Sequence, residues 1–176
     1  PSRTMGVDWD KYNKDGHGCN IVILEAVDGG GYKLIYREEI PQSEFTLTNA
    51  VNRVEQLNEI WEPRWIYCDR GYGESQIEEL QVRGKKNRGS GLDKKVIGIA
   101  FNEAVECPMP GGGVQKKIFK QVMVSVLRGW FERKQINIAK NDGILYKQLT
   151  EYHVIGESER NIKFSSKNDH LIAAMG

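Results

Sequence analysis

"MGVDWD", residues 5–10, is a short apolar run with the features of a buried strand, yet it carries Asp8 and, two residues later, Asp10. Burying a carboxylate costs several kcal/mol unless a positive charge compensates for it. The fold must therefore place something positive beside Asp8, and the rest of the chain indicates what that is.

Length, composition and charge narrow the class of protein. With 176 residues, 39% hydrophobic and 28% charged, the chain is expected to form a single domain, residues 1–176, with a sizeable core. No apolar run approaches the ~20 residues that cross a bilayer, so no membrane association is expected. The three cysteines form no CxxC pair, which argues against a disulfide scaffold or a cysteine zinc site. Residues 1–80 carry a net charge of −7 and residues 81–176 a net charge of +8, a division typical of an acidic site beside a surface that binds polyanions.

Hydrophobic periodicity and turn residues predict a mixed α/β fold, with three antiparallel strands followed by parallel strands in one sheet flanked by helices. Strands are expected over residues 4–9, 19–27, 32–40, 64–69, 96–101 and 136–139, with a closing hairpin within 153–165. The first helix is expected to start after a cap at Thr46 or Thr48 and to end at Pro63. Further helices are expected over residues 74–82, 115–134 and 142–152, and from residue 168 onward.

Two segments of the basic half carry further expectations. Residues 83–95 are polar, basic and rich in glycine, which favours a mobile loop. The helix over 115–134 is expected to bury a stripe of Ile118, Val122, Val126 and Trp130 and to turn its lysines and arginines toward solvent.

Three aspartates are expected to meet at one edge of the sheet. Asp8 lies near the end of the first strand, Asp69 ends the first parallel strand beside it, and Asp169 opens the last helix. Three converging carboxylates repel one another unless cations join them, and oxygen ligands suit two Mg²⁺ or Mn²⁺ ions. Taken singly, each aspartate could instead form a turn or cap a helix.

Three stretches, "MGVDWD", "WIYCDRGYGES" and "KNDHLIAAM", resemble in that order the acidic motifs of the ribonuclease H-like nuclease fold. More narrowly, they are similar to the C-terminal nuclease domain of the large terminase subunit of tailed bacteriophages. The similarity extends to "VIGIAFNEAV" and to "INIAKNDGILYKQLTEYHV", and thus covers nearly the whole chain.

The resemblance implies a two-metal-ion DNA endonuclease that cleaves concatemeric double-stranded phage DNA during genome packaging, in the cytoplasm of the infected bacterial host. Asp8 would bridge both Mg²⁺ or Mn²⁺ ions, Asp69 and Asp169 would each hold one, and Asp15 would at most support them. Ala173 stands where many relatives have a second acid.

The same resemblance implies that this domain is excised from a longer chain with an N-terminal ATPase motor. No GxxxxGK[ST] motif occurs in the sequence, so the motor is absent here. The portal and the small terminase subunit would be partners of the full-length protein.

Six cations in residues 83–95 are the candidate contacts to DNA phosphates, and the alternative interpretation is a solvated, disordered linker. They are Arg83, Lys85, Lys86, Arg88, Lys94 and Lys95.

Three alternatives remain open at this point. The first is a Holliday-junction resolvase or a transposase-type nuclease of the same fold. The second is a non-catalytic DNA-docking module. The third is an actin-like ATPase lobe, which the lack of a phosphate-binding glycine pair in "DWDKYNKDG" disfavours.

Overall fold

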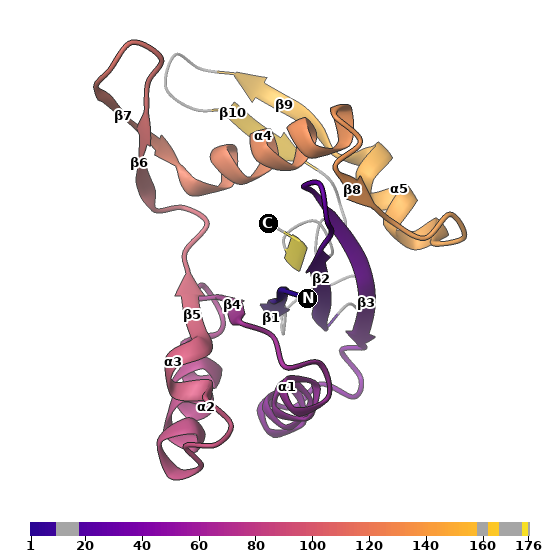
Figure 1. Cartoon of the computed structure of the whole chain (residues 1–176), viewed down its shortest axis with the longest axis vertical. Helices are drawn as coiled ribbons and strands as arrows, with labels where there is room; N and C mark the ends of the chain where they lie inside the picture. The colour runs from indigo at the N-terminus through magenta and orange to yellow at the C-terminus, as the bar shows by residue number, and fades with distance from the viewer. Residues whose placement is uncertain (10–17, 158–161, 166–173, 176) are drawn as a thin grey trace.

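A computed structural model describes residues 1–9, 18–157, 162–165 and 174–175 (Figure 1). A six-stranded sheet with the order β5-β4-β1-β2-β3-β8 forms its centre. Its strands are β1 (Arg3–Trp9), β2 (Cys19–Ala26), β3 (Tyr32–Ile40), β4 (Trp65–Asp69), β5 (Val96–Ile99) and β8 (Ile136–Asn137).

Strand directions match the expected fold class. β2 pairs antiparallel with both β1 and β3, whereas β4 runs parallel to β1 and β5 runs parallel to β4. The short strand β8 extends the other edge, parallel to β3. The expected mixed sheet of three antiparallel strands followed by parallel ones is thereby confirmed.

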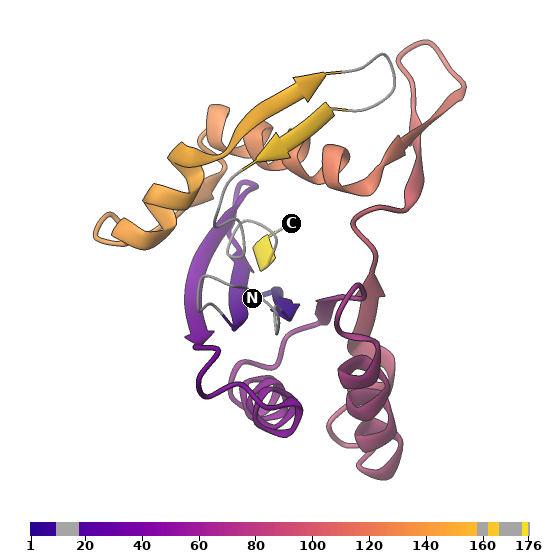
Figure 2. The ribbon, with the colours of Figure 1, turned by 180° about the vertical axis from the view of Figure 1, so that it is seen from behind.

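Helices cover both faces of the sheet. The first face packs against α1 (Leu47–Trp61), α2 (Glu74–Lys86) and the short α3 (Leu92–Lys95) through one apolar core. The second face packs against α4 (Phe119–Glu132), α5 (Gly143–Glu151) and residues 174–175 through a second core. Figures 1 and 2 show α4 and α5 at the opposite end of the molecule from α1 and α2.

Local sequence explains where the first helix begins and ends. The Thr46 side chain accepts a hydrogen bond from the Asn49 N–H (3.0 Å) and caps α1, as expected. The helix ends at Trp61, where Glu62 adopts a left-handed conformation just before Pro63. The helix boundaries that the sequence predicts around α1 are therefore confirmed.

The prediction of a mobile loop over residues 83–95 is wrong. Helix α2 continues to Lys86, and α3 occupies Leu92–Lys95. Only the connection between them, around Gly91 with its positive φ of 68°, has the loop character that the glycines suggested. Gly84 lets α2 pack closely on the start of α3, because a Cβ at this position would be 2.1 Å from the Asp93 nitrogen.

The long helix begins later than expected and buries a different face. Residues 115–118 belong to an unexpected hairpin, β6 (Ala104–Pro108) paired with β7 (Val114–Ile118), which projects from the sheet (Figure 1). Helix α4 buries Met123 and Leu127, and Trp130 of the expected stripe packs against the second core, whereas Val126 is 44% exposed. A shift of one residue along a helix corresponds to a rotation of about 100°. Apolar residues lie on more than one side of α4, so periodicity alone did not decide which side is buried.

The end of the chain agrees in part with expectation. β9 (His153–Glu157) and β10 (Ile162–Ser165) form the closing antiparallel hairpin. The start of the expected last helix lies outside the described residues. Ala174 and Met175 are described as helical, and both are buried in the second core.

The cysteines and the helices exclude two further features within the described ranges. Cys19, Cys68 and Cys107 are all free thiols in the structure. No helix there combines the length and apolar character that a membrane span requires.

Candidate active site

Asp8 and Asp69 lie side by side at one edge of the sheet. Parallel pairing matches Val7 with Cys68, so the next residue of each strand, Asp8 and Asp69, occupies neighbouring positions. Because parallel strands are about 4.8 Å apart and side chains alternate between faces, the two carboxylates share one face of the sheet. The sequence predicted this juxtaposition, and the strand register provides it.

That face is the second one, away from α1 and α2. Met5, Val7 and Trp9 belong to the first core, so the alternating residues Gly6 and Asp8 face the other way. Asp8 is buried, with 7% of its surface exposed, and Asp69 is half-buried.

The negative charges of Asp8 and Asp69 also affect two cysteine thiols on the first face of the sheet. Burial, and next the negative charge of Asp8, raises the pKa of the Cys19 thiol well above its ordinary value. Burial, followed by the charge of Asp69, does the same for Cys68. Both thiols are therefore protonated, unreactive parts of the core.

Asn20 extends the pair of aspartates into a row across three strands. It lies directly opposite Asp8 in the antiparallel ladder between β1 and β2. Ile21 and Ile23 belong to the first core, so Asn20 shares the face of Asp8. We call Asp69, Asp8 and Asn20 the acidic row. Sequence reasoning missed Asn20, although a polar residue at the second position of an otherwise apolar run was a signal.

The turn that follows β4 packs against Trp9 of the first core. The Gly71 N–H donates to the Asp69 Oδ1 (2.9 Å), which restrains the carboxylate. Gly73 lies so close to Trp9 that a Cβ would be 2.1 Å from the indole Cδ1 and 2.2 Å from the Asp69 carbonyl oxygen. The glycine is needed because no other residue lets the turn approach Trp9 this closely.

The C-terminal segment returns to the face of the acidic row. A Cβ on Gly6 would lie 1.6 Å from the Ala174 carbonyl oxygen, so that carbonyl rests on β1 two residues before Asp8. A cavity of about 360 Å³ continues along this face between β1, β4 and residues 174–175. Asp169, five residues earlier, and Asp15 lie outside the described residues.

The donor atoms of the acidic row fit a divalent cation that prefers oxygen. The two adjacent carboxylates provide oxygen ligands and no sulfur or imidazole, which suits Mg²⁺ or Mn²⁺. Within the described ranges no three His, Cys, Asp or Glu residues are grouped closely enough to hold a metal ion. A complete site would therefore need a ligand from elsewhere in the chain, as Asp169 was expected to be.

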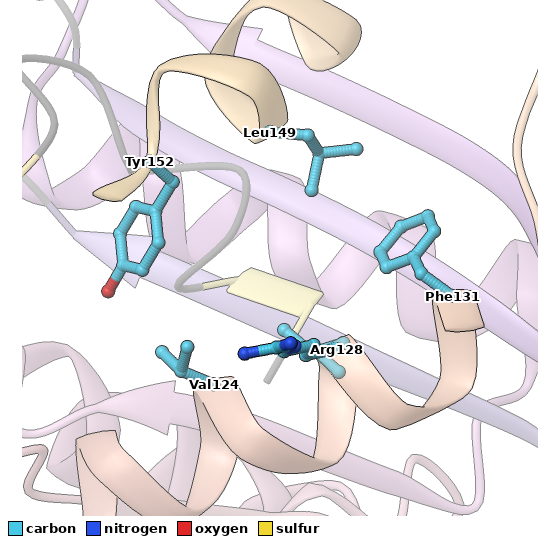
Figure 3. Close-up of a pocket in the computed structure, with 6 residues that line it drawn as sticks. Val124, Arg128, Phe131, Leu149 and Tyr152 are labelled. Carbon is cyan, nitrogen blue, oxygen red and sulfur yellow. The ribbon is translucent and has the colours of Figure 1, made fainter. Parts of the chain in front are cut away.

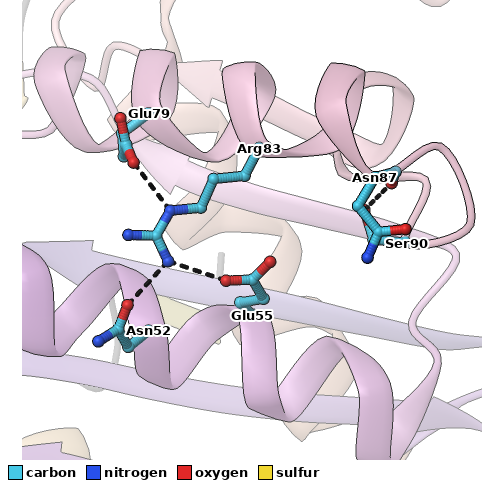
Figure 4. A network of polar contacts seen from close by, with 6 residues as sticks. All are labelled: Asn52, Glu55, Glu79, Arg83, Asn87 and Ser90. Atoms are coloured by element: carbon cyan, nitrogen blue, oxygen red, sulfur yellow. Dashed lines mark hydrogen bonds and ion pairs between the residues drawn. The ribbon is translucent and has the colours of Figure 1, made fainter.

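Arg83, one of the expected DNA contacts, links two helices instead. Its guanidinium donates to Glu79 Oε1 (2.8 Å) on α2, and to Asn52 Oδ1 (2.7 Å) and Glu55 Oε2 (2.8 Å) on α1 (Figure 4). Hydrogen bonds to Glu79 and then Glu55 raise the pKa of Arg83. We call these four residues the Arg83 cluster.

Lys95 is also engaged in packing, because its Nζ donates to Asn58 Oδ1 (3.1 Å) on α1. The other four cations of this segment are exposed: Lys85, Lys86, Arg88 and Lys94. Helix α2 starts just after the Asp69 turn and is 13 residues long, so its far end lies about 20 Å from the acidic row. The structure does not bring these cations together with the acids.

A second hollow lies between α4 and α5 and is chemically different. Its volume is about 300 Å³, and Val124, Phe131, Leu149 and Tyr152 line it beside Arg128 (Figure 3). No carboxylate is part of its lining, so it offers no site for the metal chemistry considered above.

No protein-family model matches the chain, and neither does any curated protein. Two solved structures share part of its architecture. RuvC of Thermus thermophilus superposes with a TM-score of 0.39 and 11% identity. The superposition covers 57% of this chain and 64% of the RuvC chain. The human cytomegalovirus terminase nuclease domain, in a manganese-soaked and inhibitor-bound structure, gives 0.44 and 12% over 85% of this chain and 74% of that one. Both likenesses are partial and assign no role to any residue here.

Proposed function

We propose that the chain is a metal-dependent endonuclease that hydrolyses phosphodiester bonds of double-stranded DNA at the acidic row. The observation that carries the proposal is the juxtaposition of Asp8 and Asp69 on one face, at the ends of two adjacent parallel strands. Two carboxylates so close together are costly unless a cation lies between them.

Asp8, Asp69 and Asp169 are the proposed metal ligands, with Asp8 common to two ions. Ala174 supports the third assignment, because the chain is already against Gly6 five residues after Asp169. Five residues span at most about 18 Å, so the end of β1 is within reach of a ligand at this position in the sequence. Asp15 remains a proposed supporting ligand.

The protein contributes rigid positions for these ligands. Asp8 is fixed within a central strand, and the Gly71 N–H restrains the Asp69 carboxylate through its Oδ1. When bound, the cations supply Lewis-acid stabilisation of the negative charge that develops on the phosphodiester during hydrolysis. Preformed ligand geometry limits the reorganisation that catalysis would otherwise require.

Lys85, Lys86, Arg88 and Lys94 are proposed contacts to the DNA backbone, at a distance from the site of cleavage. Their exposure supports this role, whereas Arg83 and Lys95 are engaged with α1. Such contacts add affinity without sequence preference.

The biological setting is proposed from the acidic motifs alone. Their resemblance to phage large terminases suggests concatemeric phage DNA in an infected host as the substrate. An ATPase motor, the portal and the small subunit would be the partners.

Plasmid cleavage tests the proposal. Wild type is expected to cut supercoiled plasmid with Mn²⁺ or Mg²⁺, and Asp69→Asn or Asp8→Asn to lower the rate about 100-fold or more, because each removes a charged metal ligand. Asp28→Asn, an exposed substitution in the turn between β2 and β3, is the matched control and should cut normally.

A folded wild type that is inert with both metals contradicts the proposal, as does an Asp69→Asn variant that cuts at the wild-type rate. DNA binding without cutting, indifferent to metal and to Asp8→Ala, would instead identify a docking module. A strong preference for four-way junctions would identify a resolvase.

A further inference from the structure

Asn20 is a buried amide in a place where the proposed reaction gives it no role. Only 1% of its surface is exposed, and it lies on the second face of the sheet opposite Asp8. Directly opposite residues in an antiparallel pair have Cβ atoms about 4.5–5.5 Å apart, within reach of a shared small ligand.

Neither polar atom of this amide is satisfied. Asn20 Oδ1 and Nδ2 are both buried and have no hydrogen-bond partner within the described part of the chain. Buried polar groups are normally paired, so an amide with two unpaired atoms is an exception that needs an explanation, such as a bound ion or an ordered water.

Asn58 is the informative contrast, because it is equally buried at 3% exposure. Its Nδ2 donates to the Ser90 carbonyl oxygen (3.0 Å), and its Oδ1 accepts from Lys95 Nζ (3.1 Å). The fold therefore satisfies both ends of a buried asparagine where the residue is structural. At Asn20 it leaves both ends available, beside a carboxylate.

We propose that Asn20 is a metal-binding residue, whose Oδ1 is a ligand of the divalent cation held by Asp8. The inference rests on the proposed function and adds a ligand to it. An amide carbonyl oxygen is an ordinary ligand for Mg²⁺ or Mn²⁺. It supplies this ligand without a further negative charge, on a face where Glu39 lies directly opposite Asn20 on β3.

Manganese binding to the full chain, measured by isothermal titration calorimetry and by the EPR signal of free Mn²⁺, tests this assignment without DNA. Asn20→Leu keeps the shape of the side chain and removes its oxygen, and we expect it to bind Mn²⁺ about 10-fold more weakly. Its metal-free melting temperature should equal or exceed that of wild type, since two unpaired polar atoms are removed.

Two further variants separate coordination from general packing. Asn20→Asp restores an oxygen ligand and should bind Mn²⁺ within about 3-fold of wild type or more tightly. Asn58→Leu disrupts the satisfied amide and should lower the melting temperature while Mn²⁺ affinity stays unchanged. If Asn20→Leu does not fold, Asn20→Ala replaces it with the same expected loss.

The possible failures are distinguishable. Asn20→Leu with unchanged Mn²⁺ affinity overturns this inference alone, provided that wild type binds Mn²⁺ and Asp8→Asn does not. Wild type that binds no Mn²⁺ overturns the inference and the proposed function together. A weakened Asn20→Leu that Asn20→Asp fails to restore overturns coordination through Oδ1.

Discussion

The Arg83 cluster and the acidic row both gather polar side chains between packed elements, but they are satisfied differently. Arg83 is 25% exposed and donates to three acceptors on two helices. In the acidic row, Asn20 is almost fully buried and has no partner within the described part of the chain. The Arg83 cluster is matched within the fold, whereas both polar atoms of Asn20 are left unmatched beside a carboxylate, an exception that a bound ion would explain.

The largest expected effect comes from disrupting the contact between β1 and residues 174–175, next to the acidic row. Gly6→Ala would place a Cβ within the Ala174 carbonyl group, so residues 174–175 must move off β1. We expect a loss of about 3 kcal/mol of unfolding free energy, from overpacking, together with loss of plasmid cleavage. Urea denaturation and the cleavage assay measure the two effects.

Gly143→Ala is the control for this substitution, because nothing lies within 4 Å of a Cβ at that position. It should leave stability and cleavage near wild type. Normal activity and stability in Gly6→Ala would show that the C-terminal segment does not rest on β1 as described.

The next effect comes from breaking the satisfied cluster. Arg83→Met leaves Glu55 and Glu79 without their shared cation, and we expect it to lower the free energy of unfolding by about 1–3 kcal/mol. The rate of plasmid cleavage at saturating DNA should not change. Denaturant titration and cleavage kinetics separate the two properties.

Arg128→Met is the matched control, since Arg128 is 79% exposed and pairs with Glu132, which is 59% exposed, one helical turn away. Its effect on stability should be small. If Arg83→Met instead abolished DNA binding and kept full stability, the original DNA-contact prediction for Arg83 would be the correct one.

A smaller effect concerns a second satisfied pair, on the same face as the acidic row. Asp142 caps α5, accepting the Leu145 N–H, and pairs with Arg37 on β3. Burial alone would raise the pKa of the Asp142 carboxyl, but the hydrogen bonds from Arg37 and Leu145 lower it below its ordinary value of 3.8. The stabilisation is thus present above pH 3.8 and is lost as the pH falls through the lowered folded-state pKa.

We therefore expect wild type to exceed Asp142→Asn in unfolding free energy by roughly 1 kcal/mol or less near pH 6, a difference that shrinks below pH 3.8. Denaturant titrations from about pH 2.5 to about pH 7 measure the difference. The exposed Asp28→Asn variant should show no such narrowing. A gap that widened in acid would contradict the sign.

The smallest effect concerns the exposed cations. Replacing Lys85 and Lys94 by glutamine should weaken DNA binding and reduce the salt dependence of the affinity by about one unit per lost phosphate contact. Melting temperature and cleavage at saturating DNA should stay unchanged. Lys140→Gln, exposed beyond the opposite edge strand, is the control, and an equal effect there would remove the assignment.

Sequence periodicity determined the strands, α1 and the meeting of Asp8 with Asp69. Alternating apolar residues and turn glycines are local signals, and adjacent parallel strands necessarily end at one edge. The hairpin of β6 and β7 also had a local signal, Gly111–Gly113, all with positive φ, between two alternating runs. That signal was missed because the lysines of β7 were assigned to the helix that follows.

Only the tertiary structure decided the rest, because partners distant in sequence set the outcome. Arg83 became a structural residue through Asn52 and Glu55 on another helix, and the buried face of α4 was chosen by contact with the second core. The proposed metal-binding role of Asn20 likewise depends on a residue of another strand. Its sequence neighbours mark it as a strand residue, while its place opposite Asp8, in a buried row with no partner among the described residues, comes from the register of β1 with β2.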